Sequence, residues 1–489
     1  MKHTPLAVYA PEVNKTFFTY GGTLAADSKH LLNMASYYDH ATHTVPRPTV
    51  VHDKGKDGVI DPHDNASIQI ADDGHLWIFV SGRARARPGF KYRSVEPYSV
   101  DEFEQVTTEE MTYPQPTYLE GQGFIHLFTK YTQGRELYWE TSDATGRNWS
   151  EDQKLVGFGG HYQSSAERNG LVATVFNYHP GGNVDRRTNL YFLQSADGGE
   201  TWRTADGAVV ETPLSTVDNP AMVVDYAAQG RLVYLKEVTF DQHGSPVILY
   251  VTSGDHRPGP AGDPRTWHVA HWGDSGWQVH DITSSDHNYD SGSLYVDGDE
   301  WTVVAPTDPG PQPYQTGGEM VQWKSTDDGV TWTRAAQVTD NSDYNHTYAR
   351  RPLDVNDPFY VFWADGDPTE FSPSRLYFGD STGDRYWRLP DQMDEDVARP
   401  VSMFDDPCDP PDANPTVVMG DVDSDVPNRH AEAGCTVDDL IRDEDSWNSK
   451  GPFMVHVQDV SARLTTRGVI SSQERAAIIS AAARSSIGD

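Results

Sequence analysis

The sequence predicts an all-β protein, a seven-bladed β-propeller followed by a short helical C-terminal extension. Two observations predict the propeller: short strands that recur between residues 15 and 390, and a turn motif that is repeated among them. Runs such as HLWIFVSG (75–82) and NLYFLQS (189–195) are strand-like and are separated by Gly, Asp, Asn and Pro. Period-2 runs with turn residues between them are typical of β-sandwiches and propellers.

The repeated turn motif favours a propeller over a sandwich. SADGGETW (195–202) and STDDGVTW (325–332) both fit S-x-D-x-G-x-T-W, and degenerate copies end at Trp149, Trp267 and Trp387. The five tryptophans are 53, 65, 65 and 55 residues apart, about one four-stranded blade each. Because Ser and Asp of the motif can bond the backbone of their own turn, we expect the motif to be structural. Two more blades fit before Trp149, which gives seven.

The composition changes after about residue 395, where an Asp- and Pro-rich stretch begins. We expect residues 1–395 to form a catalytic propeller, residues 396–450 an extended wrapping segment, and residues 451–489 a two-helix appendage. Ser471 and Glu474 have capping-box spacing at the start of the second helix. Two short amphipathic helices bury little apolar surface alone, so we expect them to dock on the propeller or on a partner.

The chain has two cysteines, Cys408 and Cys435, which are 27 residues apart. Neither belongs to a CxxC pair, which disfavours a zinc site built from cysteines. We expect a disulfide between them, and two unrelated buried thiols are the alternative.

The chain is strongly acidic, with a formal charge of −35, 73 acidic residues and only 11 lysines against 27 arginines. We interpret this charge as adaptation to high salt, where self-repulsion is screened; an ordinary acidic surface is the alternative. The charge argues against binding of nucleic acid through a basic surface. No apolar run approaches the roughly 20 residues of a membrane span, and the first residues lack a signal-peptide core. We expect a monomer without nucleic-acid or membrane partners. We expect it to be extracellular, as a mature form whose leader has been removed; a protein that is not exported by a visible signal is the alternative.

Four loop segments are dense in His, Tyr, Asn and Arg, and a fifth is weaker. In a propeller, loops from all blades meet at one end of the central channel. Singly, each of these residues is more often a hydrogen-bonded turn residue or a solvated charge, but together they indicate a site. They are His63, Asp64, Asn65, Arg83, Arg85 and Arg87; His161 and Tyr162; Asn177, Tyr178, His179, Arg186, Arg187 and Asn189; His346, Tyr348, Arg350 and Arg351; and, in the fifth, His287 and Tyr289.

These side chains suit β-elimination in a uronate-containing polysaccharide or oligosaccharide. The C5 proton is weakly acidic until the adjacent carboxylate is neutralised, and arginine does this with a bidentate fork. A neutral histidine or an ionised tyrosine then takes the proton, and a tyrosine or histidine donates one to the departing O4. The chemistry requires no metal, and a structural divalent cation, calcium or zinc, is compatible with it. Metal binding by the histidines has no support from an HxH or HExxH spacing.

Within residues 15–390, the segments DPHDNASI, SGR…RPGFKYRS, GGHYQ, NYHP…RRTNLYFLQSADGGETW and NHTYARRP resemble the BNR-repeat family of seven-bladed propeller polysaccharide lyases. That family includes ulvan lyases and rhamnosyl-glucuronate lyases. The resemblance implies that His63 is a catalytic histidine, that Arg187 neutralises the carboxylate, and that Tyr178 or, second, Tyr162 is the acid or base. The family often has a second histidine shortly after the first, where this chain has Arg83.

That difference leaves three interpretations: His161 or His179 substitutes, the acid–base roles differ, or the activity is lost. The remaining cluster residues are expected to bind substrate, namely Asn65, Arg83, Arg85, Asn177, Asn189, His346, Tyr348, Arg350 and Arg351. Two other functions are compatible with such a propeller. A sialidase-like glycoside hydrolase would need an arginine triad and a Tyr/Glu pair, of which VPRPT (45–49) gives only a faint indication. The other is a non-catalytic carbohydrate-binding propeller.

The acidic composition predicts that both fold and activity require molar salt. At low ionic strength the unscreened aspartates repel one another and destabilise the compact state. We expect the melting temperature to rise as NaCl increases from about 0.1 to 3 M. A melting temperature that stays flat or falls over that range would contradict the interpretation.

Overall fold

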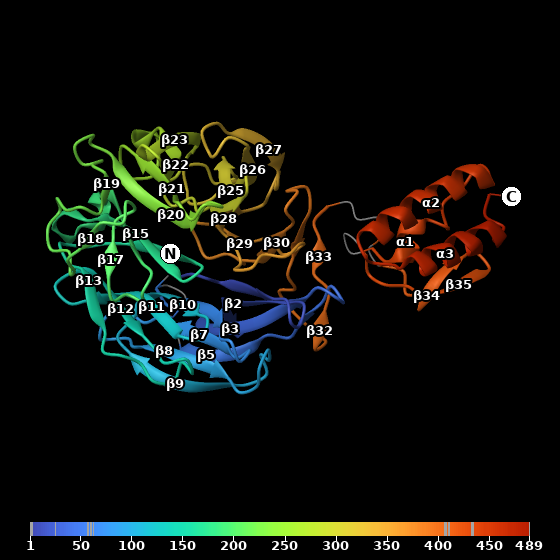
Figure 1. Cartoon of the computed structure of the whole chain (residues 1–489), viewed down its shortest axis with the longest axis horizontal. Coiled ribbons are helices and arrows are strands. Elements are labelled where there is room, and N and C mark those ends of the chain that lie inside the picture. Colours follow the sequence, from blue (N-terminus) through green and yellow to red (C-terminus); the bar gives the residue numbers. More distant parts are fainter. Residues whose placement is uncertain are drawn as a thin grey trace. The chain divides into compact units, whose positions relative to one another are not determined.

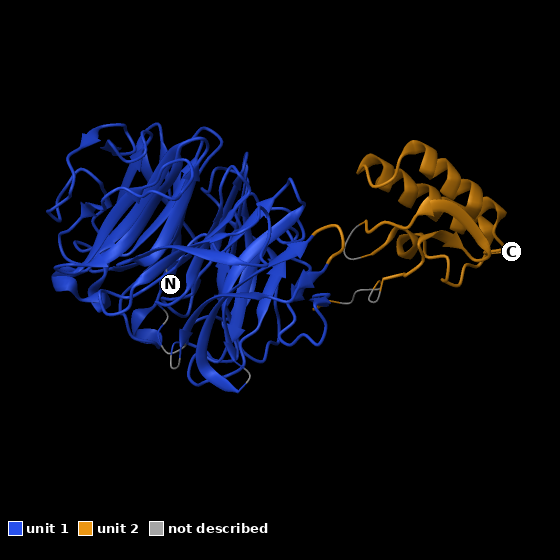
Figure 2. Ribbon diagram, turned by 90° about the horizontal axis from the view of Figure 1, so that it is seen from below, with its two compact units in different colours: residues 1–39, 44–401 blue, residues 40–43, 402–489 orange. Residues whose placement is uncertain are grey.

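The computed structural model describes residues 3–24, 26–55, 58, 61, 63–404, 408, 411–431 and 435–488. The chain divides into two compact units, residues 1–39 with 44–401 and residues 40–43 with 402–489 (Figure 2). The first unit is all β and the second is mainly helical.

The first unit is a seven-bladed β-propeller, which confirms the predicted fold class (Figure 1). Each blade is an antiparallel sheet built from consecutive strands, so no blade combines the two ends of the chain. From inner to outer strand, blades 1 to 3 are β1 (Ala7–Ala10), β2 (Lys15–Leu24), β3 (Asp27–Asp39) and β5 (Thr49–Gly55); β6 (Ala66–Ile70), β7 (Leu76–Val80), β8 (Gly89–Ser94) and β9 (Phe103–Glu109); and β10 (Thr112–Leu119), β11 (Gly123–Tyr131), β12 (Arg135–Thr141) and β13 (Gln153–Val156).

Blades 4 to 7 follow the same order. They are β14 (Gln163–Arg168), β15 (Leu171–Tyr178), β16 (Thr188–Ser195), β17 (Trp202–Arg203) and β18 (Val209–Val210), with β19 (Met222–Val224) on β16; β20 (Leu232–Phe240), β21 (Pro246–Ser253), β22 (Arg265–Gly273) and β23 (Gly276–Ser285); β24 (Ser293–Asp297), β25 (Glu300–Asp308), β26 (Glu319–Ser325) and β27 (Thr333–Gln337); and β28 (Asn345–Arg350), β29 (Val361–Gly366), β30 (Leu376–Gly379), β31 (Tyr386–Arg388) and β33 (Val401–Ser402).

The repeated turn motif is structural, as predicted. In the copy after β16, the Ser195 hydroxyl donates to Asp197 (2.7 Å) and accepts from the Gly199 N–H (2.9 Å), while Asp197 accepts from the Thr201 N–H (2.9 Å). Gly199 has a φ of 95°, a left-handed conformation that costs glycine little. Trp202 is buried between blades, 6.2 Å from Trp139.

Blades 1 and 7 close the ring through backbone and aromatic contacts. The Tyr9 N–H donates to the Leu353 carbonyl and the Leu353 N–H to the Ala7 carbonyl, both at 2.9 Å. Phe18 lies parallel to Phe359 with ring centroids 5.6 Å apart. At the outer edge, β4 (Val45–Pro46) pairs with β32 (Val397–Ala398). Closure therefore rests on contacts between the two ends of the propeller, including this small two-stranded sheet, and not on a blade that combines both ends.

The second unit has its own core. It contains β34 (Thr416–Met419), β35 (Val422–Pro427), α1 (Val437–Ile441), α2 (Lys450–Thr466) and α3 (Ser472–Arg484). Val417, Ile441, Phe453, Val457 and Ile478 are fully buried in one cluster. The predicted boundaries therefore need correction, since the segment expected to wrap the propeller supplies a hairpin and α1 to this core. The two predicted helices bury their apolar faces there.

Two smaller predictions about the second unit are confirmed. Ser471 and Glu474 form the capping box of α3. Cys408 and Cys435 form a disulfide, with Cα atoms 5.0 Å apart. Over the described part of the chain, no helix is long and apolar enough to cross a membrane.

The disulfide closes a loop of 27 residues, which should stabilise the second unit by about 3 kcal/mol through loss of loop-closure entropy. We expect the double variant Cys408→Ser/Cys435→Ser to lower the thermal midpoint of this unit in calorimetry of the full chain. The transition of the propeller serves as the internal control and should not move. Unchanged stability of the second unit would show that its helices and hairpin suffice without the bond.

Candidate active site

Most of the predicted site residues lie at one end of the propeller. Because neighbouring strands are antiparallel, the segment that precedes each inner strand and the turn between the second and third strands of a blade emerge at the same end. We call this the site end. His63 precedes β6, Tyr162 precedes β14 and Arg187 precedes β16, so the fold brings them to the same face.

Arg187 is a nearly buried guanidinium enclosed by tyrosine rings. Its side chain follows a short 3-10 turn (Val184–Arg186), and the residue is 4% exposed. Its Cζ lies 4.9, 4.6 and 5.0 Å from the ring centroids of Tyr162, Tyr234 and Tyr289. Nε donates to the Val184 carbonyl (2.7 Å) and Nη2 to the Tyr289 hydroxyl (2.5 Å).

No described carboxylate pairs with Arg187, although the chain carries 73 acidic residues. A buried charge without a counter-ion is costly, and the guanidinium fork matches a carboxylate. The geometry is therefore suited to an anionic ligand, as predicted for Arg187.

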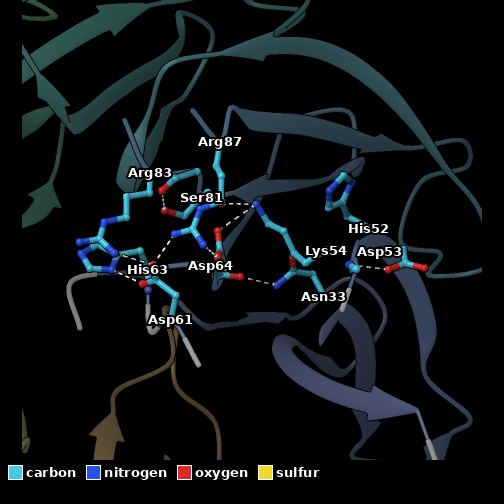
Figure 3. Close-up of polar contacts among 12 residues, drawn as sticks. Asn33, His52, Asp53, Lys54, Asp61, His63, Asp64, Ser81, Arg83 and Arg87 are labelled. Atoms are coloured by element: carbon cyan, nitrogen blue, oxygen red, sulfur yellow. Dashed lines mark hydrogen bonds and ion pairs between the residues drawn. The ribbon is translucent and has the colours of Figure 1, made fainter. Parts of the chain in front are cut away.

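His63 and Asp61 form a hydrogen-bonded pair (Figure 3). A carboxylate can only accept, so Nδ1 of His63 carries the proton and Nε2 is the basic nitrogen. Nε2 is buried and has no hydrogen-bond partner among the described residues. Burial lowers the pKa of His63, which the Asp61 carboxylate partly opposes. The ring is thus neutral at neutral pH, the state in which it can accept a proton.

Asp61 is itself held by two arginines from the turn between β7 and β8 (Figure 3). Arg83 donates to Asp61 (2.7 Å), and Arg87 donates to Asp61 and pairs with Asp64 (2.9 Å). Burial alone would raise the pKa of Asp61, but hydrogen bonds from His63 and these guanidinium groups lower it well below its usual value. The aspartate therefore stays ionised beside the imidazole.

The arginines of the turn between β7 and β8 have carboxylate partners, unlike Arg187. Arg83 and Arg87 are paired within the chain, and Arg85 is exposed and contacts Glu110 (3.3 Å). The Asn65 carbonyl accepts from the Ser81 N–H at the base of this turn. Arg83 and Arg87 therefore support Asp61, whereas Arg85 is bound to Glu110.

Tyr113 was missed by the sequence analysis and lies between His63 and Tyr162. Its ring centroid is 5.1 Å from that of His63 and 5.6 Å from that of Tyr162. It occupies a β-bulge in β10 and has a φ of 56°, a rare conformation for a bulky residue that is often found at functional sites. Burial and the neighbouring Tyr162 raise its pKa well above its usual value. No cluster of polar residues in the sequence marks this position.

The histidines of blade 4 have different environments. His179 is fully buried, and its ring lies 4.9 Å from that of Tyr162. Burial, with Arg187 and Arg135 next, lowers the pKa of His179 well below 6.5. His161 donates Nδ1–H to the Asn177 carbonyl (2.8 Å) and packs on Phe158, which indicates a structural role.

Tyr162 and Tyr178, the two tyrosines proposed from the sequence as acid or base, have different neighbours. Tyr162 contacts Arg187, whereas Tyr178 packs on Phe158 at 5.5 Å. Asn177 fixes Tyr162 by accepting from its backbone N–H (2.9 Å) while donating to the Val233 carbonyl (3.1 Å) of blade 5. Asn189 is buried and bonds the Ala227 N–H and the Tyr191 hydroxyl, so it supports the blade instead of lining the site.

Blade 7 requires correction of two expected groove residues. His346 accepts at Nδ1 from the Trp363 indole (2.9 Å) and lies 2.9 Å from the Ser342 hydroxyl through Nε2, so both ring nitrogens are occupied within the blade. Arg351 pairs with Glu237 (2.9 Å). Both side chains are held by structural contacts that the sequence pattern could not show.

Tyr348 and Arg350 are the other two predicted site residues of that segment. Tyr348 occupies a bulge of β28 with a φ of 60°. Tyr289 and Tyr162 are close enough to interact with Tyr348 electrostatically. Arg350 donates to the Ser291 hydroxyl (3.1 Å).

A buried pair fixes the loop that carries Tyr289. Lys236, in an irregular stretch of β20, donates to the Asn288 carbonyl (2.9 Å). Asp290 accepts from the N–H groups of Gly317 (2.8 Å) and His287 (3.0 Å). Burial lowers the pKa of Lys236 and raises that of Asp290. The weak fifth cluster of the sequence therefore contributes Tyr289 to the site and His287 to its support.

Within the described residues, no group of three or more His, Cys, Asp or Glu side chains is arranged to hold a metal ion. The expectation that the chemistry needs no metal stays a prediction.

Comparison with known proteins identifies similar folds. A family model described as BNR repeat-containing family member matches residues 16–285. A polysaccharide lyase PL25 ulvan lyase is similar with a TM-score of 0.65 and 15% identity over 78% of this chain and 92% of that one. A PL25 ulvan lyase structure bound to -[GlcA(1-4)Rha3S]- has a TM-score of 0.65 and 14% identity over 78% of this chain and 92% of that one. Polysaccharide lyase Uly1 has a TM-score of 0.55 and 12% identity over 77% and 90%. No curated protein matches.

Arg187 has no described carboxylate partner, whereas Arg351 pairs with Glu237, so we expect their substitution to affect the free energy of unfolding differently. Arg187→Met removes a buried charge that has no described carboxylate partner, so we expect the unfolding free energy to stay within about 1 kcal/mol of wild type. Arg351→Met leaves Glu237 unpaired in a mostly buried position and should cost roughly 2 kcal/mol. Urea denaturation of the full chain measures both. Equal losses in the two variants would show that Arg187 is a structural residue.

Proposed function

The chain belongs to the BNR repeat-containing family, and from its site geometry we propose that it is a polysaccharide lyase that cleaves an ulvan-like, glucuronate-containing polysaccharide by β-elimination. The observation that supports this most is Arg187, a buried guanidinium without a described carboxylate partner, beside Tyr162. Tyr113 lies between Tyr162 and His63, which pairs with Asp61. The likeness to ulvan lyases is one of fold, because the identities are low.

The first step is neutralisation of the substrate carboxylate. The fork of Arg187 binds the uronate carboxylate and withdraws charge, which makes the C5 proton more acidic. The surrounding tyrosine rings exclude water from this contact, which strengthens it.

The second step is proton transfer. Nε2 of His63 takes the C5 proton, the C4–C5 double bond forms, the C4–O4 bond breaks and its electron pair leaves with O4. Tyr162 donates its hydroxyl proton to O4 and is left as a phenolate. The proton on His63 returns to Tyr162 through solvent, so atoms and charge balance over the cycle. We assign the acid to Tyr162 in preference to Tyr178, because Tyr162 contacts Arg187.

His179 is the best substitute for the second histidine of related lyases, since it lies against Tyr162. Arg83 occupies the corresponding place in the sequence and instead supports Asp61. Because the proposed substrate is a polymer outside cells, we propose that the protein acts extracellularly.

We expect the wild-type chain to release a 4,5-unsaturated uronate from ulvan, followed by its ultraviolet absorbance, with gum arabic as a second substrate. Arg187→Ala should lower kcat strongly, and His63→Ala should lower it by roughly 10²–10⁴-fold. Arg203→Ala is the matched control, since Arg203 is exposed and donates to the Gly207 carbonyl in the turn after β17. Binding without the unsaturated product would favour a non-catalytic propeller, and hydrolysis without it would favour a glycoside hydrolase.

The pH profile tests the role of His63. Its pKa is lowered from 6.5, and the base must be neutral, so activity should fall only as the pH drops below 6.5 through the lowered value. Asp61→Asn removes the charge that raises this pKa, so the acidic limb should move to lower pH. An acidic limb that does not move in Asp61→Asn would exclude His63 as the titrating base.

A further inference from the structure

We infer that Arg135 is a positioning residue that stabilises the negative charge on Tyr162 after Tyr162 donates its proton to O4. This inference rests on the proposed function. Arg135 is the first residue of β12, in a part of the sequence that contains none of the polar clusters.

Arg135 is placed against Tyr162 by close contact between blades 3 and 4. Its Cζ lies 5.0 Å from the centroid of the Tyr162 ring, about as near as Arg187 at 4.9 Å. The Arg135 carbonyl accepts from the His161 N–H (2.9 Å), directly before Tyr162. A Cβ on Gly134 would lie 2.4 Å from the Gly159 carbonyl oxygen, so a glycine is needed for the turn to approach this closely.

The charge of Arg135 is not used for an ion pair. Among the described residues its side chain contacts the Tyr131 hydroxyl, to which Nε donates (3.2 Å), and Nδ1 of His179 (3.5 Å). None of the ion pairs among the described residues involves Arg135. A half-buried cation in this acidic protein that pairs with no described carboxylate is available to an anion that forms during the reaction.

That anion is the phenolate of Tyr162. When the O–H bond breaks, the proton goes to O4 and the electron pair stays on the phenol, where it is delocalised over the ring. A cation fixed beside the ring before the reaction stabilises this charge without reorganisation. Arg187 already binds the substrate carboxylate, which offsets its charge, so Arg135 is the cation that remains for Tyr162.

We would measure steady-state kinetics of Arg135→Met on two substrates. On the natural polysaccharide, kcat should fall about 10²-fold with little change in KM, as for loss of one group that stabilises an oxyanion. On a uronate oligosaccharide with an aryl leaving group at C4, which needs no proton to depart, the loss should largely vanish. Arg135→Lys keeps the charge and should recover part of kcat. Arg203→Met is the surface control, and circular dichroism checks folding.

A double variant of Arg135 and Tyr162 tests whether Arg135 acts through Tyr162. If Arg135 acts through Tyr162, Arg135→Met should have little further effect in a Tyr162→Phe background. An equal loss on both substrates, or a full additional loss in the Tyr162→Phe background, would overturn the inference. If the wild type eliminates neither substrate, the proposed function itself fails. Elimination by the wild type with unchanged kcat in Arg135→Met would refute the role of Arg135 alone.

Discussion

The arrangement of the site depends on one buried positive charge, the guanidinium of Arg187. Three tyrosine rings and a backbone carbonyl hold it, and no described carboxylate neutralises it. Aromatic faces attract a cation but remove little of its charge. The protein therefore keeps a desolvated cation ready for a ligand, in a chain where aspartates and glutamates outnumber basic residues almost two to one.

Three inner strands are irregular at polar residues of the site or of its support. β10, β20 and β28 each break register, at Tyr113, Lys236 and Tyr348 respectively. A bulge turns a side chain away from the regular alternation of the strand. Two of these residues also have positive φ, which is costly for tyrosine and persists only when the surrounding structure enforces it. The propeller supplies that enforcement, because each inner strand is held between two neighbouring blades.

The sequence predicted the fold class, the blade repeat and the disulfide, because each has a local signature; the roles of His63 and Arg187, which lie at the same end of the propeller, stay predictions. The sequence did not predict Tyr113 or Arg135, since their contacts with His63 and Tyr162 are made between neighbouring blades and have no local signature in the sequence. The second unit was misjudged for a related reason. Its Asp- and Pro-rich composition indicated an extended segment, yet a few apolar residues such as Val417 and Ile441 are enough to complete a core with the helices.

Hydrogen-bond direction separates the histidines more reliably than their position in polar clusters. In His63, the acceptor Asp61 fixes the proton on Nδ1 and leaves Nε2 as a base. In His346, the indole of Trp363 can only donate, so Nδ1 must accept and Nε2 must carry the proton toward Ser342. A histidine in that tautomer cannot activate the serine, although the pair resembles a nucleophile and its base. The same residue type thus has opposite chemistry at two positions, and the group that hydrogen-bonds to Nδ1 decides which.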